Sequence, residues 1–191
     1  MNKSKVIRIS SMATKSCHSN SVIFDTALIN AKARDARQSA RKRDIHIFHG
    51  GDQDPLQRML NAIQPGSYIT PHRHYIPPKS ESIVLLQGML GYASFGDDGT
   101  PQEADFTLLD AKRGIYGLDI RPGVWHTIFA LDRDTVIFEV KPGPYDPSPD
   151  KGFAPWAPPE DNPAATKYLI ELEDRFRSFW KLPPRSWPGI L

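Results

Sequence analysis

Apolar and polar positions change their spacing along the chain, and each change marks a different kind of predicted element. From Thr26 to Gln38, apolar and alanine residues recur at helical spacing, and Asp25 stands where a helix cap is expected. After residue 66 the apolar runs shorten and alternate with turn sequences, which predicts strands. Helical spacing returns after Asn162 and Pro163 and gives an amphipathic C-terminal helix with one apolar face: Tyr168, Leu169, Leu172, Phe176, Phe179 and Trp180.

Two short elements are expected before the strand-rich region. Residues 44–49 are rich in apolar side chains and predict an edge strand. Asp54 can cap a following helix, and Pro55 suits its first position because the missing N–H costs nothing there. The helix is expected to run to Ile63, with one apolar face formed by Leu56, Met59, Leu60 and Ile63.

The strand-rich region predicts an antiparallel sandwich or small barrel. Turn sequences at 96–99 and 121–123 separate the runs. Alternation in the first run places four side chains on one face: Tyr68, Thr70, His72 and His74. The expected strands cover residues 67–74, 81–86, 89–95, 106–109, 114–120, 126–131 and 135–141.

These elements divide the chain into four predicted parts. Residues 1–20 are polar and are expected to be a disordered tail. Residues 21–63 form a helical and edge-strand extension packed on the barrel, and residues 64–141 form the barrel. Residues 142–191 combine a proline-rich segment with the C-terminal helix, and the apolar side chains of Tyr145, Phe153 and Trp156 are expected to hold that segment on the surface.

Length and composition agree with one domain that has one core. The chain has 191 residues, and its single cysteine, Cys17, excludes an intrachain disulfide. No apolar run approaches the roughly 20 residues that span a bilayer. The polar start of the chain also lacks the apolar stretch of a secretory signal. We therefore expect a cytoplasmic protein with no membrane partner.

Charge is spread unevenly, although the formal net charge is only +2. Residues 1–49 carry ten Lys and Arg against three Asp and Glu, and the rest of the chain carries fourteen against nineteen. A basic arm can bind nucleic acid. The basic residues from 31 to 43 also fit the solvated face of a helix, and no interleaved aromatic pattern accompanies them. We expect no nucleic-acid partner.

The chemistry centres on His72 and His74, which are separated by one residue. Same-face Cα atoms of a strand lie roughly 6.6–6.8 Å apart, so both imidazoles can reach one metal ion. Glu81 follows in the next predicted strand, and His126 lies in another. Three imidazoles and one carboxylate suit Zn, Fe, Mn, Ni or Co better than Ca or Mg. An octahedral ion held by these four residues keeps two positions open for water or substrate.

This spacing resembles the cupin family. Its first motif, G-x5-H-x-H-x3,4-E-x6-G, is matched by Gly66, His72, His74, Glu81 and Gly88, except that six residues separate the second histidine from the glutamate. The second motif is matched in part, by Gly123 and His126, and lacks its usual proline and its terminal asparagine. The resemblance implies a jelly-roll β-barrel over residues 64–141, with His72, His74, Glu81 and His126 as metal ligands. It also implies a homodimer, because cupins are commonly dimers.

A longer similarity, over about residues 25–172, resembles the WbuC family of cupin-fold metalloproteins. The segments that carry it are 54–62, 64–68, 71–74, 125–127, 138–145 and 153–158. Members of that family are often associated with bacterial O-antigen and other polysaccharide gene clusters. The resemblance therefore implies a small-molecule ligand related to carbohydrates.

Two functions follow. The first is a metalloenzyme, similar to isomerases or epimerases, that acts on a sugar or sugar nucleotide; an Fe-dependent dioxygenase is a variant, since the same ligands serve O₂ chemistry. The second is a non-catalytic module that binds a metal or a small molecule. Candidates for proton transfer are Tyr68, Tyr92 and Glu139. Candidates for holding an anionic group are Arg73, Lys79 and the basic stretch 41–43.

Overall fold

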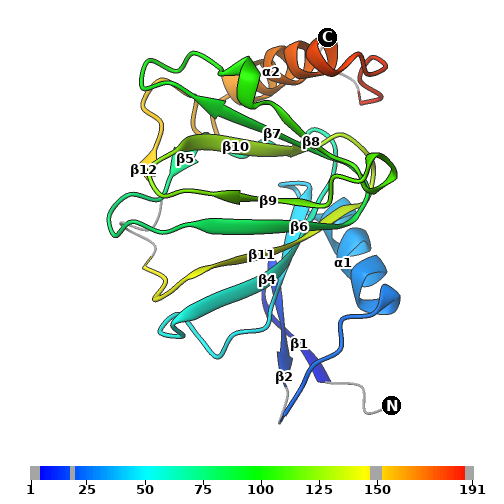
Figure 1. Ribbon diagram of the computed structural model, residues 1–191. Helices are drawn as coiled ribbons and strands as arrows, with labels where there is room; N and C mark the ends of the chain where they lie inside the picture. Colours follow the sequence, from blue (N-terminus) through cyan, green and yellow to red (C-terminus); the bar gives the residue numbers. More distant parts are fainter. Residues whose placement is uncertain (1–4, 18–19, 147–151, 188–191) are drawn as a thin grey trace.

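Two β-sheets face each other, and one helix covers the outer side of each (Figure 1). The structure is a computed structural model that describes residues 5–17, 20–146 and 152–187. Helix α1, Thr26–Gln38, packs on the larger sheet, and helix α2, Ala164–Trp180, packs on the smaller one. The expected mainly β architecture with antiparallel sheets and a C-terminal helix is confirmed, whereas the described N-terminal part contains one α-helix rather than several.

The larger sheet has seven strands in the order β1-β2-β3-β4-β11-β6-β9. Every neighbouring pair is antiparallel except β2 and β3, which run parallel. In chain order its strands are β1 (Lys5–Ser10), β2 (Ala13–Cys17), β3 (Arg43–Ile47), β4 (Leu56–Ile63), β6 (Glu81–Gln87), β9 (Gly117–Ile120) and β11 (Thr135–Pro142).

The smaller sheet has five antiparallel strands in the order β12-β5-β10-β7-β8. Its strands are β5 (His72–Arg73), β7 (Leu90–Phe95), β8 (Thr107–Leu109), β10 (Trp125–Ala130) and β12 (Gly152–Phe153). Two single-turn 3₁₀ helices flank β8: Glu103–Asp105 and Ala111–Arg113. All of the strands expected between residues 81 and 141 are present, with ends shifted by a few residues at most.

Three apolar clusters hold these layers together. The cluster between the sheets includes Ile83, Leu90 and Ile137, all at most 1% exposed. A second cluster joins the smaller sheet to α2 through Phe176, and a third joins the larger sheet to α1 through Leu60. Each sheet therefore packs against a helix on its outer face and against the other sheet on its inner face. Polar side chains fit on the inner faces only where a cavity separates the sheets.

The N-terminal segment is the first correction. The expected disordered tail over residues 1–20 forms a hairpin, β1 and β2, within its described part. Polar rather than apolar contacts hold it, which is why its hydropathy pattern gave no signal. Arg8 on β1 binds Asp44 at 2.7 Å and Asp35 at 2.7 Å, and the buried Lys32 of α1 also pairs with Asp44.

The segment 55–63 is the second correction, because it is strand β4 and not a helix. Leu60 and Ala62 face α1, while Gln57, Met59 and Asn61 line the inner side of the sheet. A strand covered on both faces loses the simple alternation of apolar and polar residues. The expected edge strand at 44–49 is β3, which has neighbours on both sides and so is not an edge.

Residues 67–71 are a third correction, since the strand expected over 67–74 is reduced to His72–Arg73. In the proline-rich segment, Phe153 pairs with His72 through β12, yet its side chain is 61% exposed and does not anchor the segment. Trp156 does pack inward, with its ring centroid 5.0 Å from that of Phe95.

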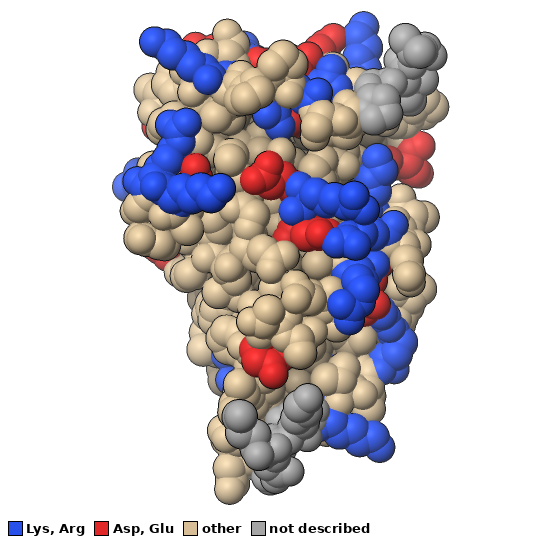
Figure 2. Space-filling view, turned by 90° about the vertical axis from the view of Figure 1, so that its right-hand side faces the viewer, with Lys and Arg blue, Asp and Glu red and all other residues tan. Residues whose placement is uncertain are grey.

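The basic residues near the N-terminus are largely paired. Arg37 of α1 binds Asp134, and Lys32 of the same helix is buried against Asp44. Figure 2 shows Lys and Arg along one side of the molecule with Asp and Glu interspersed among them, instead of one uninterrupted basic surface. Among the described residues, neither helix is long and apolar enough to cross a membrane.

Candidate metal centre

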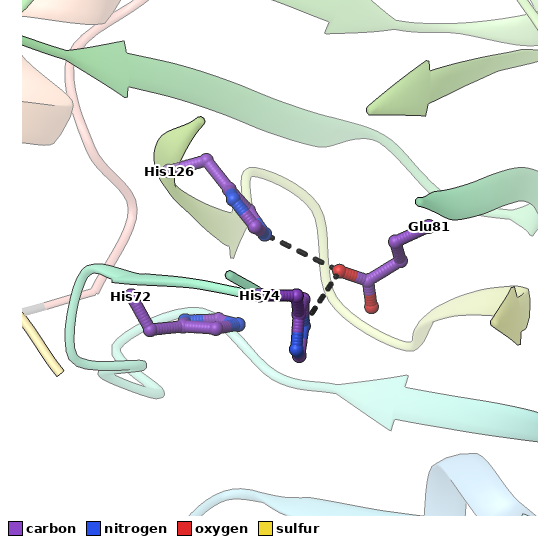
Figure 3. A group of neighbouring side chains, drawn as sticks. All are labelled: His72, His74, Glu81 and His126. Carbon is purple, nitrogen blue, oxygen red and sulfur yellow. Dashed lines mark hydrogen bonds and ion pairs between the residues drawn. The ribbon is translucent and has the colours of Figure 1, made fainter. Parts of the chain in front are cut away.

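The structure brings His72, His74, Glu81 and His126 together from both sheets (Figure 3). His72 on β5 and His126 on β10 face each other in register, and His74 follows β5 directly. The backbone N–H of Gly123 donates to the carbonyl of His74 at 3.0 Å, which fixes the turn after that strand. Glu81 begins β6 in the larger sheet, so its carboxylate reaches the histidines from the opposite layer.

All four side chains are buried, and their ligand atoms lie within 4.8 Å of one another. Two ligands bound at about 2.1 Å to one ion can be at most about 4.2 Å apart. Small adjustments of the side chains are therefore enough for one ion to bind all four. The residues present fit a divalent transition metal held by three imidazoles and one carboxylate.

Backbone carbonyls fix the tautomers of two of these histidines. Nδ1 of His72 lies 3.0 Å from the carbonyl of Thr70, and Nδ1 of His126 lies 2.9 Å from that of Val124. A carbonyl only accepts, so each Nδ1 carries the proton and donates it. In a neutral ring Nε2 then presents a lone pair, which is the state a metal ligand requires.

Glu81 completes the centre electrostatically. Its Oε2 lies 3.3 Å from Nε2 of His126 and 3.4 Å from Nε2 of His74. Burial opposes ionisation of this carboxyl, but hydrogen bonds with His126, His74 and Glu139 hold its pKa well below the ordinary value. Two lone-pair atoms this close need a proton or a cation between them, and a metal ion can replace the proton.

A cavity of about 380 Å³ opens beside the centre, between the sheets. Strands β3, β4 and β11 form one wall, and Phe153 and Glu160 come from the segment before α2. A neighbouring cavity of about 340 Å³ shares Arg41, Phe153 and Glu160 with the first. None of the four candidate ligands lines these cavities, but the lining residue Phe153 has its ring centroid 6.3 Å from that of His72.

Glu139 is the one proton-transfer candidate that both lines the larger cavity and contacts a candidate ligand. It hydrogen-bonds to Glu81, and its Oε1 lies 3.8 Å from Nζ of Lys141. Nδ2 of Asn61 donates to Glu139 Oε2 at 3.4 Å. Glu139 therefore places a second carboxyl group next to the centre, beside Glu81.

The two tyrosine candidates have different positions. Tyr92 stacks on His126 with ring centroids 6.1 Å apart, and burial raises its pKa to about 12. Tyr68 does not join His72 and His74, contrary to the expected shared face. Its hydroxyl donates to the carbonyl of Pro158 at 2.8 Å, and its ring packs against Tyr168 of α2. The irregular backbone over 67–71 breaks the alternation that the expectation required.

The anion-binding candidates also separate. Arg73 stacks on Trp125 at 4.2 Å, and the buried Lys79 donates to the carbonyl of Pro144 at 2.6 Å; neither lines the described cavities. Arg41 and Arg43 do line the larger cavity, and both bind Glu160. Lys42, between them in the sequence, points elsewhere and lies over the ring of Trp187.

Several cavity residues were not predicted as functional from the sequence. Gln57, Asn61 and Lys141 face the cavity, and Glu160 bridges the two arginines. The first two were hidden by the helical reading of 55–63. The available signal for a strand was weaker than a full alternation: Gln57 and Asn61 lie on one side of it, and Leu60 and Ala62 lie on the other.

A family model described as a domain of unknown function, DUF6016, matches residues 24–106. That range includes His72, His74 and Glu81 but ends before His126. No curated protein matches the chain. The family match therefore adds no activity to the geometry.

Solved structures with a similar fold include the capsular polysaccharide assembling protein CapF of Staphylococcus aureus, with a TM-score of 0.43 and 19% identity over 57% of this chain and 28% of that one. L-ribose isomerase of Cellulomonas parahominis has a TM-score of 0.40 and 20% identity, over 53% of this chain and 59% of that one. A cupin-2 domain protein of Rhodospirillum rubrum has a TM-score of 0.43 and 13% identity, over 73% of this chain and 78% of that one. The chain thus spans less than a third of CapF and most of the cupin-2 protein. Likenesses of this size carry no conclusion about family or activity, and the sandwich of two sheets follows from the strands of this chain alone.

Proposed function

We propose that the protein binds one divalent transition metal through His72, His74, Glu81 and His126 and is an isomerase-like or epimerase-like enzyme acting on a sugar or sugar nucleotide. The observation that carries the proposal is the convergence of three buried imidazoles and one carboxylate beside a cavity. The sequence similarity to the WbuC family supports a role in the biosynthesis of bacterial surface polysaccharides.

Each residue has a defined task in this proposal. When bound, the metal acts as a Lewis acid that polarises a carbonyl or hydroxyl group of the substrate. Glu139 accepts a proton from the adjacent carbon and returns it, because its carboxyl group lines the cavity and contacts Glu81. Asn61 and Lys141 orient that carboxyl group through their contacts with it.

Elemental analysis of the purified protein tests the metal. We expect about one equivalent of a transition metal in the wild type, and its loss in His72→Ala and in His126→Ala, because each substitution removes one of four ligands. His49→Ala is the matched control, since His49 is buried in the same cavity wall but is hydrogen-bonded to the backbone of Arg58. Metal that survives both ligand substitutions contradicts the site.

Solvent exchange tests the chemistry. In D₂O, metal-loaded protein is expected to introduce deuterium next to the carbonyl of a sugar substrate, as NMR measures. Glu139→Gln should slow this exchange by roughly 10²–10⁴-fold and keep its metal, because an amide cannot accept the proton. Tyr68→Phe is the control, since its hydroxyl faces Pro158 and not the centre.

Solvent exchange and oxygen consumption together separate the alternative functions. Exchange that is absent for every aldose, ketose and sugar nucleotide tested, in protein with a full metal content, favours the non-catalytic binding module. Oxygen consumption by the iron-loaded protein favours the dioxygenase instead.

A further inference from the structure

We infer that the cavity takes an uncharged or singly charged monosaccharide, with one of its hydroxyl groups donating to Asn61 Oδ1, and not a nucleotide-linked sugar. The inference rests on the proposed function and narrows its substrate class. It is carried by three properties of the cavity: the balance of its charges, its size, and a buried acceptor on β4.

The charges of the lining cancel. Arg41, Arg43 and Lys141 face three carboxylates, those of Asp52, Glu139 and Glu160. Burial lowers the pKa of His49, which keeps that ring neutral near pH 7. Including a divalent ion, neutral histidines and the Glu81 carboxylate, the site gains one net positive charge. A single negative charge on the ligand is therefore the most that the site neutralises.

Each cation of the lining already has a carboxylate partner. Arg41 donates to Glu160 Oε2 at 2.7 Å, and Arg43 binds the other oxygen of the same carboxylate. Nζ of Lys141 lies 3.8 Å from Glu139. A diphosphate carries about two negative charges, so it has to displace these carboxylates before it can pair with the same cations.

The size and the surfaces of the cavity suit a monosaccharide. Its volume of about 380 Å³ lies at the lower end of small-molecule pockets, which range over about 300–1,000 Å³. Apolar side chains of Ile45, Ile47, Met59 and Ile69 alternate in the lining with amides, carboxylates and guanidinium groups. A sugar ring offers the same mixture, with C–H faces and hydroxyl groups that both donate and accept.

Asn61 supplies the specific contact. Its Oδ1 is a buried acceptor without a hydrogen-bond partner among the described residues, while Nδ2 donates to Glu139. An unmade hydrogen bond of this kind destabilises a fold and calls for an explanation. The terminal torsion of an asparagine is soft, so a small rotation can present Oδ1 to the cavity. A hydroxyl group next to the centre is the donor that fits.

Calorimetric titration of the full-length, metal-loaded protein tests the substrate class. Glucose, galactose and glucuronate are each compared with their UDP-linked forms. We expect at least one free sugar to bind, at least about tenfold more tightly than its UDP-linked form. Tighter binding of the UDP form, or no binding of any free sugar, overturns the inference. The metal content of the same samples reports separately on the proposed function.

Asn61→Leu tests the contact, with Trp156→Phe as the matched control. Nε1 of Trp156 is also buried without a hydrogen-bond partner among the described residues, but Trp156 does not line either described cavity. Asn61→Leu should weaken binding of the best sugar about tenfold or more and keep the metal, whereas Trp156→Phe should change neither. Unchanged affinity in Asn61→Leu, or loss of its metal, overturns the role of Asn61.

Deoxy analogues of the best sugar identify the hydroxyl group. One analogue should bind the wild type about tenfold more weakly than the parent sugar does. The same analogue and the parent sugar should bind the Asn61→Leu variant equally tightly. Equal losses in both proteins for every analogue contradict a direct contact.

Discussion

His46 shows how a single buried side chain can tie an N-terminal arm to the sheet. It is 0% exposed on β3, and its two ring nitrogens lie 2.7 Å from the hydroxyl oxygens of Thr14 and Ser16 on β2. Burial, helped by the nearby Lys32, lowers its pKa to about 4, although Asp44 acts in the opposite direction. The ring therefore stays neutral in the folded protein under mildly acidic conditions.

This neutrality predicts a pH dependence of stability. The unfolded histidine titrates near pH 6.5 and the folded one near pH 4, so the unfolded state binds more protons between these values. The stabilisation is full above pH 6.5 and is lost as the pH falls toward 4, by up to roughly 3 kcal/mol. Urea unfolding of the wild type and of His46→Gln at several pH values measures it, and the variant should show a flatter profile. Parallel profiles contradict the assignment.

The candidate ligands were predictable because their signal is local or depends on one pairing. The side chains of His72 and His74 point to one side if the short backbone between them is extended. Glu81 is the first residue of β6 and His126 lies in β10, and the apolar pattern located both strands well. The prediction for Tyr68 is wrong because it assumes a strand through residues 67–71, where the backbone is irregular. Asn61 was missed since its segment was read as a helix.

At the scale of elements, β4 shows where hydrophobic periodicity misleads. Leu56, Met59, Leu60 and Ile63 have helical spacing, yet the segment is held as a strand by β3 on one side and β11 on the other. Such partners are distant in sequence and cannot be read from a local window. The hairpin β1–β2 was missed for a related reason, because its ion pairs with α1 and β3 are long-range.

Helix α2 gives a prediction at this scale. Phe176 is 0% exposed, and its ring centroid lies 5.2 Å from those of both Phe106 and Phe129. Phe176→Ala should lower the free energy of unfolding by about 3–5 kcal/mol, because it leaves a cavity between the helix and the sheet. Phe179→Ala, one turn further at 46% exposed, should cost clearly less. Equal costs in urea unfolding contradict the docking of α2 through Phe176.

At the scale of the whole molecule, the candidate centre joins the two sheets. Three histidines belong to the smaller sheet or its adjoining turn, and Glu81 belongs to the larger one. An ion bound by all four therefore links the layers and binds the folded protein only. The fold class could be predicted from the sequence, since strands and turns alternate regularly after residue 66. The order of the strands could not, because it depends on pairings between distant segments.

Metal removal should consequently lower the thermal midpoint. At a free metal concentration about 100 times the Kd, binding adds about 2.7 kcal/mol to the free energy of unfolding. Treatment with a chelator should remove this contribution, and re-addition of the metal should restore it in the wild type and in His49→Ala but not in His126→Ala. A midpoint that does not respond to the chelator contradicts a metal shared between the sheets.

The position of β11 has a consequence for how the protein is made on the ribosome. This strand pairs with β4 on one side and β6 on the other, although it follows them by more than 45 residues in the chain. Until residue 142 has left the exit tunnel, β6 cannot join β4, and Glu81 cannot be held opposite the histidines. A nascent chain that stops before β11 should therefore be unable to retain the ion, even though it already contains every residue that binds it.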